Sequence, residues 1–119
     1  MILFLIVLIL TGVFKAIADT LAHHYSTSIF TKYDPKFFDP SISWLNKYID
    51  RDVTKGIDKR KFQPFTDAWH IANSLMITSF LLLSFLIPTN VHGIIDFCIT
   101  GTINVLSFNL FYNHLLIKK

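Results

Sequence analysis

The chain has 119 residues, of which 52% are hydrophobic and 16% are charged, and its formal net charge is +3. A water-soluble domain of this length would contain more charge. The hydrophobic residues are concentrated in three runs that are almost free of charged side chains, which is typical of helices embedded in lipid. We therefore predict an all-α protein with three transmembrane helices in a single membrane domain, residues 1–119. Sequence patterns of nucleic-acid binding are missing, so we expect no nucleic-acid partner.

The first run, residues 2–22, is long enough to cross the hydrocarbon layer as one helix, since about 20 helical residues span about 30 Å. An alternative is a secretory signal peptide, because Ala16-Ile17-Ala18 resembles a cleavage site. No Lys or Arg precedes the hydrophobic run, however, and Lys15 lies where cleavage regions are usually uncharged. These two features favour a retained transmembrane helix.

Residues 25–65 have a different composition and are expected to form a loop outside the membrane. This segment holds eight of the eleven Lys and Arg residues. Asp39-Pro40 is a typical helix start, and hydrophobic residues then recur at helical spacing, which predicts a short amphipathic helix over residues 40–49 on the membrane surface. Residues 50–61 are expected to be a solvated loop. The basic run Lys59, Arg60 and Lys61 is expected to contact anionic lipid headgroups.

The second transmembrane helix is predicted over residues 67–88, with Thr66 as its N-cap and Asp67 in the first turn. Only residues 89–92 separate it from the third helix, predicted over residues 93–116, so these two helices should be antiparallel neighbours. The small residues Gly93, Gly101 and Ser107 are expected to allow close contact between helices.

Three spans place the loop and the C-terminus on the same side of the membrane. That side receives ten of the eleven Lys and Arg residues. The positive-inside rule then predicts an outer N-terminus, a cytoplasmic loop and a cytoplasmic C-terminus.

Several ionisable residues are predicted at the cytoplasmic ends of the helices. Ionisable side chains are costly near the membrane, so they are usually paired or functional there. Asp19 and His23 are four residues apart in the first helix, and Asp67 and His70 are three apart in the second. Together the four are candidate ligands for a divalent metal such as zinc, iron or manganese. His70 oriented by Asp67 is also a candidate catalytic pair for general acid–base chemistry. The alternative is that these residues are only helix-end polar groups. His92 and Asp96 are expected to pair at the outer face.

Two strings resemble a family of small bacterial and phage-encoded membrane proteins, whose members are mostly hypothetical proteins. They are Phe37-Phe38-Asp39-Pro40-Ser41-Ile42-Ser43-Trp44-Leu45-Asn46-Lys47-Tyr48 and Thr66-Asp67-Ala68-Trp69-His70. The resemblance extends from about Ala18 to Asn73, and departs from the family at residues 61–65, where a longer Ser/Thr-rich apolar stretch is usual. The resemblance implies that the protein is located in the bacterial inner membrane and that it shares a characteristic surface with the family. It does not imply any reaction. The residues implied in that surface are Trp44, Asn46, Asp67, Trp69 and His70.

Three functions remain open at this stage. The polar cluster favours a metal-binding or lipid-directed membrane enzyme. A phage holin-like pore former would share the predicted topology, although its connecting loops tend to be short. An accessory subunit of a membrane complex would use the helix at residues 40–49 for docking. Assembly into a homo-oligomer is compatible with all three.

Overall fold

The computed structural model describes residues 2–86 and 94–118, with no side chains described for residues 94–97. The prediction of an all-α chain is confirmed, since the described residues form helices and no strand. Three long helices dominate the fold: α1 (Ile2–His24), α4 (Ala68–Leu86) and α5 (Ile94–Leu110), which continues as the π-helix η7 (Phe111–Leu116). The predicted range 2–22 agrees with α1 to within two residues, and the predicted start at 67 and end at 116 lie within one residue of the start of α4 and the end of η7. The predicted end at 88 and start at 93 lie outside the described residues.

Short helices fill the segment between α1 and α4. They are η1 (Tyr25–Thr27), η2 (Ile29–Lys32), α2 (Pro35–Phe38), α3 (Pro40–Ser43), η3 (Trp44–Lys47), η4 (Ile49–Arg51), η5 (Val53–Lys55) and η6 (Gln63–Phe65).

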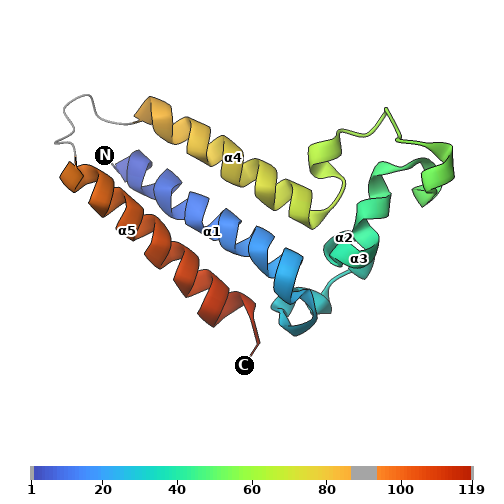
Figure 1. Cartoon of the computed structure of the whole chain (residues 1–119), viewed down its shortest axis with the longest axis horizontal. Helices are drawn as coiled ribbons and strands as arrows, with labels where there is room; N and C mark the ends of the chain where they lie inside the picture. The colour runs from blue at the N-terminus through green and yellow to red at the C-terminus, as the bar shows by residue number, and fades with distance from the viewer. Residues whose placement is uncertain (1, 87–93, 119) are drawn as a thin grey trace.

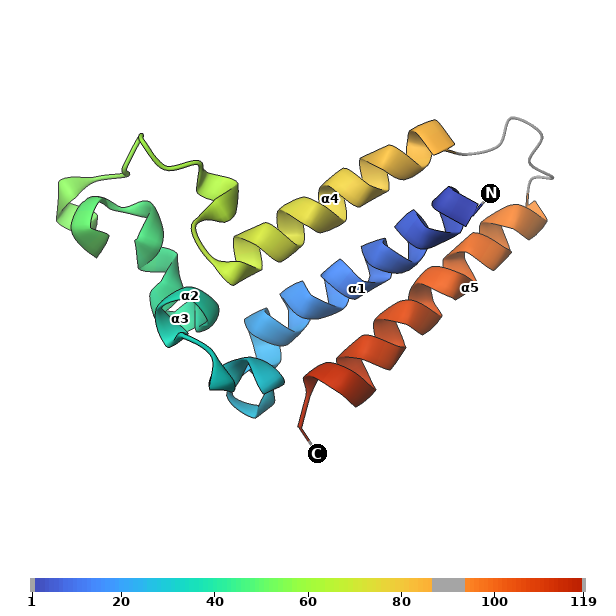
Figure 2. The same cartoon turned by 180° about the vertical axis from the view of Figure 1, so that it is seen from behind.

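The first helix lies between the other two long helices (Figure 1). Figure 2 shows the same order from behind, with α4 and α5 on opposite sides of α1. The prediction that these two helices are neighbours is therefore wrong, because each of them packs on α1 instead. The small hydrophobic core therefore centres on α1: Val7 and Leu8 pack with Leu83 of α4, and Ile103 of α5 packs against this group. Because α1 contacts both neighbours, it supplies most of the interhelical packing.

Close contact between α1 and α5 depends on Gly12. A Cβ atom at this position would lie 2.8 Å from the carbonyl oxygen of Asn104 and 2.9 Å from Cβ of Ser107. The Asn104 side chain in turn donates a hydrogen bond of 3.2 Å to the carbonyl oxygen of Leu8. Ser107 thus lies at a close contact, as predicted, but a Cβ on Gly101 would meet nothing within 4 Å. Gly93 lies outside the described residues.

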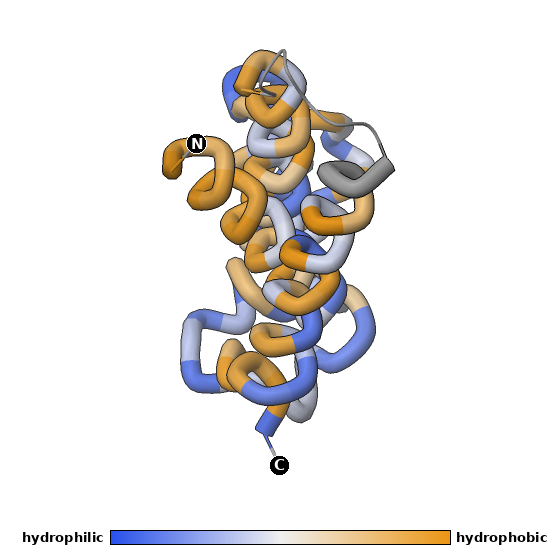
Figure 3. The backbone as a smooth tube through the Cα atoms, turned by 90° about the vertical axis from the view of Figure 1, so that its left-hand side faces the viewer, coloured by the Kyte–Doolittle hydropathy of each residue, from blue (hydrophilic) through white to orange (hydrophobic). Residues whose placement is uncertain are grey.

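The C-terminal end of α1, the start of α4 and the C-terminus of the chain lie at the same end of the bundle (Figure 1). The rings of His24 and Tyr112 pack edge to face, with centroids 5.5 Å apart. Beyond η7, Ile117 pairs with Ser28, and the Lys118 amide donates 2.7 Å to the Thr27 carbonyl. In Figure 3 the long helices are largely hydrophobic, whereas polar residues alternate with hydrophobic ones at the end that carries the C-terminus.

The helix predicted over residues 40–49 is shorter in the structure. Asp39 caps it by accepting a hydrogen bond of 2.9 Å from the Ser41 amide, and α3 continues as η3 only to Lys47. Tyr48 is extended and pairs with Ile57, while the Ile49 amide donates to the Gly56 carbonyl at 3.1 Å. The chain leaves the helix because these backbone groups bond across the loop instead.

Candidate functional site

The N-terminus of α4 is capped by Asp67, and not by Thr66 as predicted. Thr66 closes the preceding turn, since its hydroxyl donates to the Gln63 carbonyl at 2.9 Å. Asp67, the next residue, caps the helix instead: its carboxylate accepts a hydrogen bond of 2.9 Å from the His70 amide. A carboxylate in this position satisfies a free amide and is stabilised by the helix dipole.

The second oxygen of the same carboxylate holds the His70 ring. Oδ2 of Asp67 lies 2.6 Å from Nδ1 of His70. The Asp67 side chain is only 3% exposed, whereas the His70 side chain is 35% exposed. An ionised carboxylate can only accept a hydrogen bond, so an ionised Asp67 selects the His70 tautomer that has the proton on Nδ1 and the lone pair on Nε2. This is the arrangement by which a carboxylate orients a histidine for proton transfer.

Two neighbours fix the surroundings of this Asp67–His70 pair. The Trp69 and His70 rings pack edge to face with centroids 4.9 Å apart. Asn46 reaches the same turn from the loop, where its side-chain amide donates to the Thr66 carbonyl at 2.9 Å and to the Lys36 carbonyl at 2.8 Å. Both protons of that amide are used, so Asn46 fixes the loop relative to the start of α4.

The structure does not bring the four predicted metal ligands together. Asp19 forms an ion pair with Lys15, one turn earlier in α1. His23 is exposed, and only Asp67 and His70 are in contact. Among the side chains that the structure describes, those of residues 2–86 and 98–118, no three of His, Cys, Asp or Glu are arranged to hold a metal ion. The polar residues at this end of the bundle thus form two separate pairs, Lys15–Asp19 and Asp67–His70, and not one metal site. His92 and the side chain of Asp96 lie outside the described parts.

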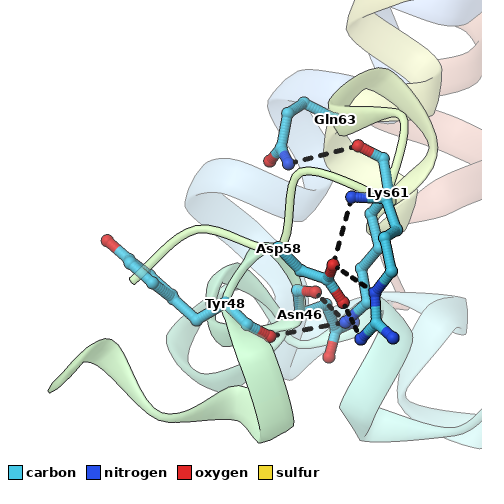
Figure 4. Close-up of polar contacts among 6 residues, drawn as sticks. Asn46, Tyr48, Asp58, Lys61 and Gln63 are labelled. Atoms are coloured by element: carbon cyan, nitrogen blue, oxygen red, sulfur yellow. Dashed lines mark hydrogen bonds and ion pairs between the residues drawn. The ribbon is translucent and has the colours of Figure 1, made fainter. Parts of the chain in front are cut away.

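A second polar cluster lies in the loop, where residues 50–61 were expected to be simply solvated. The Asp58 side chain is 6% exposed and receives Nε of Arg60 at 2.9 Å and Nη2 at 3.0 Å. This fork of hydrogen bonds from Arg60 lowers the pKa of Asp58 to about 2. Beside it, Nζ of Lys61 donates to the Asn46 carbonyl at 2.7 Å (Figure 4). The charge of Arg60 is thereby paired with Asp58, whereas Nζ of Lys61 makes no ion pair with a described carboxylate.

Two helical segments are long and apolar enough to cross a membrane: Ile2–Thr27, which combines α1 and η1, and α4. The α-helical part of the third predicted span is 17 residues long. Only a third or less of each candidate span is buried within the chain, with values of 33% and 11%.

Comparisons with protein-family models, with curated proteins and with solved structures give no match. The resemblance described above therefore stays a prediction. Of the residues that it implies, Asp67 and His70 are in contact, and Asn46 donates to the carbonyl of Thr66, which precedes Asp67. Sequence reasoning missed Arg51, whose Nη2 donates to the Ile42 carbonyl at 2.8 Å. No motif surrounds this residue, and its backbone is in the left-handed region.

Proposed function

We propose that this chain is an integral protein of the bacterial plasma membrane, with α1, α4 and α5 as its three spans. The supporting observation is the exposure of large hydrophobic side chains along the long helices. Phe80 and Phe85 of α4 are 68% and 84% exposed, and Leu106 and Leu110 of α5 are more than half exposed. A continuous apolar surface of this kind is costly in water and is stable in lipid.

The third span combines α5 and η7. Together they run from Ile94 to Leu116, which is 17 plus 6, or 23, residues. At about 1.5 Å per residue this length is sufficient for the hydrocarbon layer of a bilayer. The orientation with an outer N-terminus follows from charge, since the loop and the C-terminus together carry ten of the eleven Lys and Arg residues.

Topology is tested by labelling single cysteines in intact cells with a membrane-impermeant maleimide. With Cys98→Ser as background, Lys59→Cys should react only after the cells are permeabilised. Thr89→Cys, in the turn predicted to face outward, should react at once. The reverse pattern would contradict the orientation, and recovery of the chain in the soluble fraction would contradict membrane insertion.

At the cytoplasmic end of this bundle, we propose that Asp67 and His70 form a proton-transfer site that acts on a lipid headgroup or a lipid-soluble substrate. The single observation that carries this proposal is the buried Asp67 carboxylate, 2.6 Å from Nδ1 of a half-buried His70. Nε2 of His70 accepts a proton from a substrate hydroxyl or water, and Asp67 stabilises the imidazolium that results.

This site is tested by incubating the detergent-purified protein with a total bacterial lipid extract and comparing lipids by mass spectrometry. We expect wild type to change at least one lipid species. His70→Ala should abolish the change, and Asp67→Asn should slow it strongly. His23→Ala removes an exposed histidine from the same end of the bundle and is the matched control. No change with wild type, or an equal change with His70→Ala, would contradict an enzymatic role.

A second candidate function is that of an accessory subunit. The observation that favours it is the exposure of Ile42 and Trp44 on the loop, at 36% and 41%. Both belong to the predicted docking helix, and exposed aromatic residues of this kind often anchor protein interfaces. Trp44→Ala should then reduce co-purification of a membrane partner, whereas His70→Ala should not. The pore-forming alternative has less support, because the loop contains long-range hydrogen bonds such as Asn46 to Thr66.

A further inference from the structure

A pocket of about 450 Å³ lies beside the start of α4, and neither Asp67 nor His70 lines it. Its walls are formed by Asn46, Arg51, Lys61, Phe62, Phe65 and Thr66. The Asn46 amide and the Thr66 carbonyl are already bonded to each other. The groups that remain to meet a ligand are therefore two cationic side chains and two phenyl rings.

Both cations are held in place by neutral carbonyl groups. Nη2 of Arg51 donates to the Ile42 carbonyl at 2.8 Å, and Nζ of Lys61 donates to the Asn46 carbonyl at 2.7 Å. No carboxylate among the described residues pairs with either side chain, whereas Arg60 and Lys55 are paired with aspartates. The nearby Asp58 is occupied by Arg60 through both of its oxygens (Figure 4). The pocket therefore presents two positive charges that no ion pair compensates.

The backbone at Arg51 supports a specific role for this side chain. Asp50 and Arg51 have φ angles of 50° and 61°, in the left-handed region that residues other than glycine seldom adopt. Two successive residues in this region store strain, which persists where the surroundings enforce it. The bonds that enforce it include the Ile49 amide to the Gly56 carbonyl at 3.1 Å and the Arg51 amide to the Tyr48 carbonyl at 3.2 Å.

The other wall of the pocket is aromatic and open. Phe62 and Phe65 are 67% and 60% exposed, and their ring centroids are 5.2 Å apart. Phe62 directly precedes η6 and Phe65 is its last residue, and η6 contacts α4 (Figure 1). Exposed phenyl rings next to a transmembrane helix are expected to contact acyl chains. A free anion would contact only the two cationic side chains, whereas a phospholipid would contact both the cationic side chains and the phenyl rings.

We propose that this pocket binds an anionic phospholipid, with the phosphate between Arg51 and Lys61 and the chains beside Phe62 and Phe65. Arginine and lysine are the side chains that hold phosphate most effectively. The site differs from the basic run 59–61 expected from the sequence, because Arg60 is paired with Asp58 and the pocket is lined by Arg51 and Lys61. The inference rests on the proposed membrane location and is independent of the Asp67–His70 chemistry.

The test is native mass spectrometry of the detergent-purified full chain with added phosphatidylglycerol or phosphatidylcholine. We expect wild type to retain phosphatidylglycerol in preference to phosphatidylcholine. Arg51→Gln and Lys61→Gln should each weaken phosphatidylglycerol binding about fivefold, as expected for loss of one cation near an anionic lipid. Lys59→Gln makes the same change of charge at an exposed neighbour and should bind as wild type does.

Phe62→Ala serves as a second variant, because the Phe62 ring is exposed and its loss leaves the hydrogen bonds of the loop intact. It should lower phosphatidylglycerol retention even if the glutamine variants misfold. Equal retention of the two lipids, or wild-type retention by folded Arg51→Gln, Lys61→Gln or Phe62→Ala, would overturn the proposal. Displacement of the lipid by millimolar inorganic phosphate would reassign the pocket to a free anion. Recovery of the chain in the soluble fraction would overturn both the lipid site and the proposed membrane location. Loss of lipid preference alone would overturn only the lipid site.

Discussion

The side-chain amide of Asn46 donates a hydrogen bond of 2.9 Å to the carbonyl oxygen of Thr66, twenty residues away in the sequence. The same amide donates to the Lys36 carbonyl at 2.8 Å. One side chain thus joins three segments: the turn before α4, the end of η3 and helix α2. It holds the loop against the residue that precedes the capping Asp67.

Asn46→Ala should therefore destabilise the loop and the start of α4. The substitution leaves the Lys36 and Thr66 carbonyl groups without their donor, and we expect it to lower the free energy of unfolding by about 1–3 kcal/mol. Thermal unfolding of the detergent-purified protein, followed by tryptophan fluorescence, measures this loss. Asn113→Ala removes an exposed amide that bonds only Asn109 and should have little effect. Equal melting temperatures for wild type and Asn46→Ala would contradict this role.

Gly12→Ala should separate α1 from α5. The new methyl group would lie 2.8 Å from the Asn104 carbonyl oxygen, a backbone atom that cannot move without shifting the helix. Overpacking of this kind costs about 1–3 kcal/mol. Gly101→Ala is the matched control, since its methyl group meets nothing within 4 Å and alanine favours helix. Similar stability of the two variants in thermal unfolding would show that α1 and α5 do not pack as described.

Asp67 should act in stability as an N-cap, separately from any chemistry. Asp67→Ala loses the acceptor of the His70 amide and should destabilise the protein by about 0.5–2 kcal/mol. Asp67→Asn keeps an acceptor oxygen at the same place and should be close to wild type in thermal unfolding. If Asp67→Asn is destabilised as much as Asp67→Ala, the charge and not the cap is what the fold requires.

Asp58 should remain ionised to a pH of about 2, because the Arg60 guanidinium lowers the pKa of Asp58 to about 2. The folded pKa is below the ordinary value of 3.8, so ionised Asp58 stabilises the loop fully above about pH 4. This contribution is lost as the pH falls from about 4 through 2. Carbon-13 NMR of labelled aspartate carboxyl groups measures the titration directly.

Arg60→Gln should return the pKa of Asp58 towards 3.8 and shift the acid transition of the loop to higher pH. Lys55→Gln removes the partner of Asp50 instead, and should leave the Asp58 titration unchanged. A pKa for Asp58 that is the same in wild type and Arg60→Gln would exclude the ion pair as its cause.

The sequence predicts the long helices well because their signals are local. Hydropathy locates α1, α4 and α5, and Asp39-Pro40 marks the start of α3. It also predicts that the end of α1 and the start of α4 share one end of the bundle. Such signals depend on a few successive residues, so they survive without any knowledge of tertiary contacts.

Contacts between distant segments could not be predicted in the same way. A helix that is hydrophobic on every side gives no sign of which face meets its neighbour. The sequence therefore did not indicate the close contact at Gly12, and it indicated one at Gly101 that the structure does not have. The four predicted metal ligands show the same limit. Each pair has helical spacing, yet Asp19 turns to Lys15 and His23 to the surface, leaving only Asp67 and His70 together.

The central position of α1 has a consequence for biosynthesis. The helix that is made first is also the one that both later helices require as a partner, with α4 on one side and α5 on the other. During synthesis, the Gly12 face of α1 has no partner helix until α5 emerges from the ribosome. In the proposed membrane location, lipid or an insertion factor would cover this face of α1 for that interval, and a chain that ends before residue 94 would leave the face without its partner helix.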